Sequence, residues 1–252
     1  MHTDAATGST AAMGAASEPP ASASALTRKL LACGAAAGPL YLVVGAVQVL
    51  TREGFDMRRH PLSLLSNGDL GWIQIANFIV AGALVLAGAV GVRRRLHPGR
   101  AATWGPILLA VWGIGLIGSG LFVADPGQGF PPGVVVEEGA MSRSGMLHFV
   151  FGGLAFYALV GACMVFARRF WGLGQRGWAL YSLLSGVGFL IVFGGIASGS
   201  TASVFMLSFY AAVAWIWVWH AAVSVRLMPA ALQAGRTTPV HDVGADRGEM
   251  VR

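Results

Sequence analysis

The chain has 252 residues, of which 55% are hydrophobic and only 11% are charged. Soluble domains carry about 25% charged residues, so this composition excludes an ordinary soluble globular chain and indicates an integral membrane protein. The net charge of +6 is spread over separate loops rather than gathered on one basic face, which argues against nucleic acid as a partner. The two cysteines, Cys33 and Cys163, lie in apolar stretches and form neither a disulfide framework nor a cysteine-based zinc site.

Residues 1–27 are mostly small or polar, and we expect a disordered tail because such a stretch buries too little surface to offset its ordering entropy. Six apolar runs follow, and none contains Asp, Glu, Lys or Arg. A helix of about 20 residues crosses a hydrocarbon core of about 30 Å, and lipid leaves no partner for unpaired backbone groups. The predicted spans are residues 30–50, 72–92, 104–124, 146–167, 178–197 and 203–225.

These spans predict an all-α polytopic membrane protein, a six-helix transmembrane bundle within residues 28–226, followed by a flexible tail at residues 227–252. Six spans place both termini on one side. Thirteen of the 17 basic residues lie on that side, and the positive-inside rule then predicts cytoplasmic N and C termini in a bacterial plasma membrane. The four basic residues on the other side are Arg52, Arg58, Arg59 and Arg143.

Tryptophans and glycines predict how the spans are placed and packed. Tryptophan favours the membrane interface, so six of these residues are expected there. Glycine lets helix backbones approach closely, which indicates packing within the bundle, with contact between copies of the chain as the alternative. The six tryptophans are Trp72, Trp104, Trp178, Trp215, Trp217 and Trp219, and the glycines are Gly34, Gly38 and Gly45 in the first span with Gly113, Gly115, Gly118 and Gly120 in the third.

The two loops predicted to lie outside hold most of the remaining polar residues. The first leads from His60 and Pro61 to Gln74 and Asn77, two amides spaced to share one helix face that should look into the bundle. The second, residues 125–133, is rich in proline and glycine and is expected to form a compact cover.

A family resemblance is carried by two strings in these loops. The first is Arg59-His60-Pro61-Leu62-Ser63 with Leu65-Ser66, Gly71-Trp72-Ile73-Gln74 and Asn77-Phe78, and the second is Asp125-Pro126 with Gly129-Phe130-Pro131-Pro132-Gly133, Gly145 and His148. Over residues 30–225 the sequence resembles the membrane family catalogued as domain of unknown function 998. The resemblance implies a helical bundle and supplies no mechanism.

One hypothesis is that His60, Ser63, Asn77, Asp125 and His148 converge into a catalytic site. Two histidines and a carboxylate are a plausible zinc set, so His60, Asp125 and His148 are the candidate metal ligands. Alternatively, His and Asp could orient a serine nucleophile, Ser63 or Ser66. Either site would hydrolyse or transfer an ester of a lipid headgroup.

A structural interpretation of the same residues stays open. His148 would then hydrogen-bond Asp125 or a loop carbonyl, while His60 would sit among lipid headgroups, and His220 is expected at the inner membrane interface. The sequence thus predicts a multi-pass membrane protein with a structural or accessory role in the cell envelope and the lipid bilayer as its surroundings. A lipid-modifying hydrolase or transferase and a small-solute facilitator are the alternatives.

Overall fold

In the computed structural model, residues 21–99, 101–135, 141–199 and 202–228 are described. They contain no β-strand, which confirms the all-α prediction. The elements are α1 (Ala21–Thr51), the short 3-10 helix η1 (Leu62–Ser66), α2 (Gly71–Leu96), α3 (Ala101–Leu121), α4 (Arg143–Gly172), α5 (Arg176–Ala197) and α6 (Ser203–Leu227).

Most helix ends differ by a few residues from the predicted spans, and two of the differences affect earlier predictions. The first helix starts at Ala21, inside the stretch expected to be a disordered tail, because its Ala-rich start favours helix. Helix α3 ends at Leu121, so Asp125 lies in the following loop. Residues 1–20 and 229–252, which make up most of the two predicted tails, lie outside the described residues.

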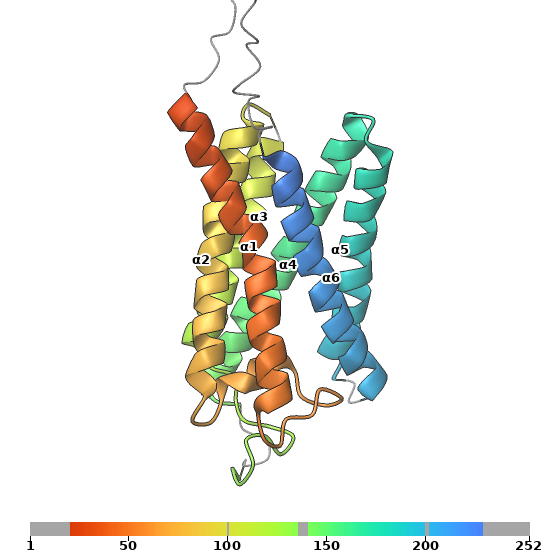
Figure 1. The fold of residues 1–252 in the computed structure, drawn as a ribbon. Helices are drawn as coiled ribbons and strands as arrows, with labels where there is room; N and C mark the ends of the chain where they lie inside the picture. The colour runs from red at the N-terminus through yellow and green to blue at the C-terminus, as the bar shows by residue number, and fades with distance from the viewer. Residues whose placement is uncertain (1–20, 100, 136–140, 200–201, 229–252) are drawn as a thin grey trace, which may run out of the picture.

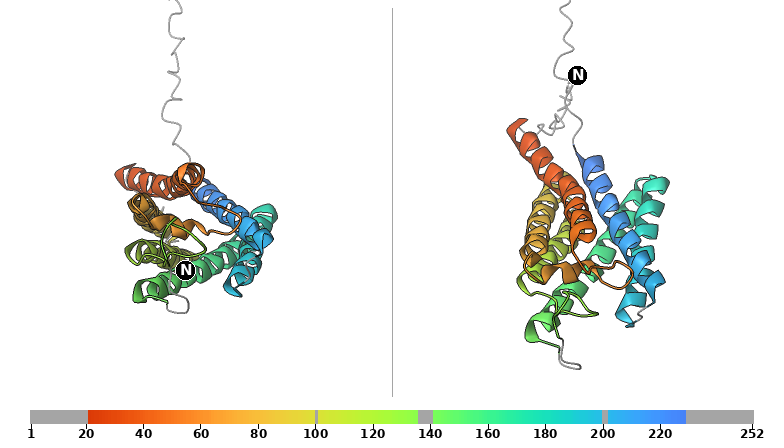
Figure 2. Two further views of the ribbon diagram at one scale, coloured as in Figure 1. Left: turned by 90° about the horizontal axis from the view of Figure 1, so that it is seen from below. Right: turned by 60° about the horizontal axis from the view of Figure 1, so that its bottom comes forward.

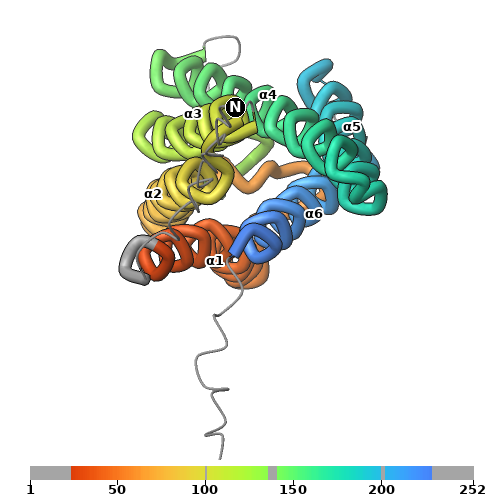
Figure 3. The backbone as a smooth tube through the Cα atoms, turned by 90° about the horizontal axis from the view of Figure 1, so that it is seen from above, coloured from red at the N-terminus to blue at the C-terminus, as the bar shows by residue number. Residues whose placement is uncertain are grey.

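The six helices form a ring in chain order (Figures 1 and 3). Each helix packs against the next, and α6 closes the ring by packing against α1. The first and last described residues lie at the same end of the bundle (Figure 1). We call this the arginine end, since Arg93 to Arg95 at the end of α2, Arg168 and Arg169 near the end of α4, and Arg226 at the end of α6 lie there.

All six helices are long and apolar enough to cross a membrane, so the chain is a multi-pass membrane protein. Their outward faces carry large exposed apolar side chains, including Val80, Ile114, Leu184, Ile191 and Val218. Lipid is a solvent for such side chains, whereas water would expel them.

Glycines bring helices of the same chain close together. A Cβ on Gly34 would lie 3.1 Å from the Cα of Gly88, and one on Gly82 would lie 2.6 Å from the carbonyl oxygen of Gly113. Helices α1, α2 and α3 are therefore joined at positions where only glycine fits.

The prediction of a membrane-interface position is wrong for Trp217, Trp219 and His220. Trp72 and Trp104 are exposed near helix ends, but Trp217 and Trp219 are buried, and His220 is 1% exposed. The reason is that α6 closes the ring, so its side chains face α1 and α3 on one side and α4 and α5 on another.

Candidate functional site

The end of the bundle opposite the arginine end is covered by two interlocked loops, residues 52–70 and 122–135, which we call the loop cap (Figure 2). The guanidinium of Arg52 donates to the carbonyls of Leu65 and Asn67 and lies 5.3 Å from the ring centroid of Phe130. Partial burial lowers the pKa of Arg52, and the charge of Asp69 opposes that shift. One arginine at the end of α1 thus holds both loops.

His60 is the central residue of the loop cap and is completely buried. Its Nδ1 accepts the amide of Asp56 at 2.9 Å, so Nε2 carries the proton and donates to the carbonyl of Gln128 at 3.0 Å. The carbonyl of His60 accepts the hydroxyl of Tyr210 from α6 at 2.7 Å. The residue therefore joins both loops to α6, and its two ring nitrogens are already occupied.

Asp125 and Ser142 connect the end of α3 to the start of α4. The carboxylate of Asp125 accepts the amide of Ser142 at 2.8 Å and also the Ser142 hydroxyl. Ser142 caps α4 by accepting the amide of Gly145 at 3.0 Å. A Cβ on Gly145 would collide with the Asp125 carboxylate, so the capping geometry requires glycine there.

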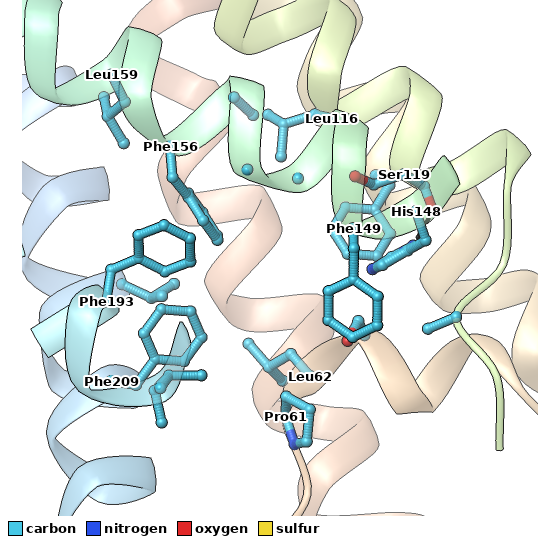
Figure 4. A pocket seen from close by; sticks show the side chains of 18 of the residues that line it. Pro61, Leu62, Leu116, Ser119, His148, Phe149, Phe156, Leu159, Phe193 and Phe209 are labelled. Carbon is cyan, nitrogen blue, oxygen red and sulfur yellow. Dashed lines mark hydrogen bonds between the residues drawn. The ribbon is translucent and has the colours of Figure 1, made fainter. Parts of the chain in front are cut away.

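His148 lies one turn into α4 and is 6% exposed. Its Nδ1 lies 3.0 Å from the carbonyl oxygen of Ser119 and 2.9 Å from that of Phe122. Carbonyls only accept, so Nδ1 holds the proton, and in the neutral ring Nε2 keeps a free lone pair. Figure 4 shows the ring with one nitrogen directed into a pocket.

Asn77 is buried between α1 and α2, away from these groups. Its amide donates to the carbonyl of Tyr41 at 3.1 Å and to Gln74 Oε1 at 3.3 Å. Gln74 also accepts the amide of Gln48 at 2.9 Å. The two predicted amides do face into the bundle, and Gln48, a polar residue inside the first apolar run, is the partner that the sequence analysis overlooked.

The five predicted catalytic residues therefore lie in different places. Ser63, Asp125 and His148 line one pocket, whereas His60 is enclosed in the loop cap and Asn77 in the α1–α2 interface. Within the described part of the chain, no group of three His, Cys, Asp or Glu residues could hold a metal ion. The structure thus does not bring His60, Asp125 and His148 together.

The pocket has a volume of about 560 Å³ and lies inside the ring beneath η1, with lining residues from all six helices. Polar groups line the end near the loop cap: Ser63, Ser119, Asp125, His148 and the hydroxyl-bearing Tyr41 and Tyr210. The deep end is apolar and is formed by Trp112, Leu116, Leu159, Ile216 and Trp217, with Phe156, Phe193 and Phe209 forming a wall (Figure 4).

A pair of glycines and a set of phenylalanines help to form this pocket, and neither was recognised from the sequence. Gly152 and Gly153 remove side chains from the face of α4 that borders the cavity, and a Cβ on Gly153 would meet no atom within 4 Å. The aromatic wall comes from three helices, with the rings of Phe156 and Phe193 4.9 Å apart and those of Phe156 and Phe209 5.8 Å apart.

The fold and the pocket define a six-helix membrane protein with an amphipathic cavity. The chain matches the family described as Protein of unknown function (DUF998) over residues 35–226, and it belongs to that family. A comparison with curated proteins and with solved structures gave no match.

Proposed function

We propose that this protein binds a lipid-like amphiphile in the pocket, with its polar end beneath the loop cap and its apolar chain directed toward the middle of the bundle. The observation that carries this proposal is the division of the lining into a polar end and an apolar end. A small-molecule site is commonly a mostly apolar cavity of about 300 to 1,000 Å³ with a few placed polar groups. The cavity of about 560 Å³ fits that description.

The depth of the pocket supports a ligand that occupies one leaflet. His148 at the polar end and Leu159 at the apolar end both lie on α4 and line the cavity. Eleven helical residues separate them, a rise of about 16 Å, roughly half of a hydrocarbon core of about 30 Å. An acyl or alkyl chain from a single leaflet therefore suits the cavity.

The excess of basic residues at the arginine end supports a cytoplasmic location for that end and a plasma-membrane location for the chain. With this orientation, the loop cap and the polar end of the pocket face outward. The ligand would then enter from the outer leaflet.

Lipid binding can be tested on the material that co-purifies with the protein. Wild type and Gly153→Leu are isolated in a mild detergent, extracted with organic solvent and analysed by mass spectrometry. Leucine at position 153 projects into open space and reduces the cavity, so we expect wild type to retain about one lipid per chain and the variant to lose most of it.

Gly188→Leu is the matched control. Gly188 is an exposed glycine on α5 that also has no atom within 4 Å of an added Cβ, but it does not line the pocket. It should retain lipid as wild type does. Equal retention by all three proteins, or none in wild type, would contradict the proposal and leave the structural role or the solute facilitator.

A further inference from the structure

The polar groups of the pocket specify the chemistry of the ligand. We infer that the pocket takes a neutral lipid whose polar end carries a hydroxyl, such as a long-chain alcohol or an acylglycerol, and that this hydroxyl donates to His148 Nε2. This inference rests on the proposed lipid binding and adds the chemical class to it.

The first argument is the fixed acceptor. Both carbonyls beside Nδ1 need its proton, so they orient the imidazole with Nε2 as a lone-pair acceptor toward the cavity. Among the described residues, no donor hydrogen-bonds to this nitrogen within the bundle. The His148 ring lines the pocket, so this acceptor is available to the hydroxyl of a ligand.

The second argument is charge. The described residues that line the pocket include no lysine and no arginine, and their one ionisable acid is Asp125. Phosphate and carboxylate headgroups are recognised by guanidinium or ammonium groups, whereas Asp125 would repel them. Of the three arginines in the loop cap, Arg52 already donates to two carbonyls there, and Arg58 and Arg59 are exposed and do not line the pocket. The cavity therefore disfavours anionic lipids.

The third argument is that the remaining polar groups suit an alcohol. Ser63 and Ser119 carry hydroxyls that either donate or accept. Tyr41 Oη accepts the amide of Gln74 at 3.5 Å, which leaves its own proton to donate. An alcohol oxygen has one proton for His148 and two lone pairs for such hydroxyls.

Three probes that share one brominated 18-carbon chain test the inference: the alcohol, its methyl ether and the carboxylate. Bromine quenches tryptophan fluorescence, and Trp112 and Trp217 line the deep end of the pocket. Quenching is titrated on the full-length protein in detergent, and the quenching that persists in Gly153→Leu is subtracted as partitioning. We expect the alcohol to bind about tenfold more tightly than the ether, as one net hydrogen bond implies. The carboxylate should bind at least as weakly as the ether.

His148→Asn separates recognition from structure. Asparagine keeps an N–H near the position of Nδ1 and has no atom at the position of Nε2. The preference for alcohol over ether, about tenfold in wild type, should disappear, while the affinity for the ether stays unchanged. A purely structural role for His148 would weaken both probes equally.

Each outcome has a distinct meaning. Carboxylate binding as tight as alcohol binding, or an alcohol preference that survives in His148→Asn, would overturn the inference while leaving lipid binding in place. Saturable quenching by none of the probes in wild type would contradict the proposed function itself.

Discussion

The two halves of the ring are packed differently. Helices α1 to α3 are joined by glycines whose backbones touch. Helices α4 to α6 carry the phenylalanine wall of the pocket, and α3 adds Trp112, Leu116 and Ser119 to the lining. Small side chains at contact positions close the space between helices, whereas large rings set around two glycines keep a space open. The first half therefore acts as a scaffold, and the second half supplies most of the helix residues that line the candidate site.

Replacing a glycine with leucine in each half should give the largest difference in stability. Gly82→Leu places a side chain 2.6 Å from the carbonyl oxygen of Gly113 and 2.7 Å from Ile117, so we expect a loss of about 3 kcal/mol or more in stability. Gly153→Leu meets open space and should remain as stable as wild type or gain up to about 1 kcal/mol from helix propensity. Thermal unfolding in one detergent compares them, and similar melting temperatures would refute the contrast.

His60→Ala should weaken the contact between the two loops of the loop cap. It removes the side-chain bonds to Asp56 and Gln128 from a completely buried site, and we expect a loss of about 2 kcal/mol together with faster proteolysis in residues 122–135. His97→Ala, an exposed histidine after α2, is the control and should change stability by less than about 0.5 kcal/mol. Unchanged proteolysis in His60→Ala would mean that the loop cap is held by other contacts.

The smallest expected effect concerns the amides of the scaffold half. Gln74→Leu leaves the side-chain amides of Gln48 and Asn77 without their shared acceptor, and we expect a loss of about 1 kcal/mol. Replacing Gln48 with leucine as well should recover part of that loss, because one unpaired group is then removed. A double variant less stable than Gln74→Leu would show that side-chain packing, not hydrogen bonding, dominates at this position.

The six helices could be predicted because each apolar run excludes charge over the length of a membrane span. The inward direction of Gln74 and Asn77 could also be predicted, because their spacing places both amides on one helix face and buried amides need partners. Convergence of His60, Asp125 and His148 could not be judged, because it depends on how the loops fold over the bundle. In the structure His60 is used by loop carbonyls and amides, and Asp125 by the start of α4.

The cavity itself was beyond single-sequence reasoning, since the hollow is formed by residues of six helices that meet only in three dimensions. Trp217 illustrates the difficulty. Near the end of an apolar run it resembles an interface tryptophan, yet α6 closes the ring against α1, and the ring of Trp217 packs 4.5 Å from that of Trp112 inside the bundle.

The order of the helices around the ring bears on how the protein is made. Neighbours in sequence are neighbours in space, so the first five helices can associate as each leaves the ribosome. Gly38 on α1 lies against the backbone of Trp217, and this contact must wait until the last helix has been inserted. Trp217 and Ile216 also line the deep end of the pocket. A nascent chain therefore completes this pocket only at the moment when its first and last helices meet.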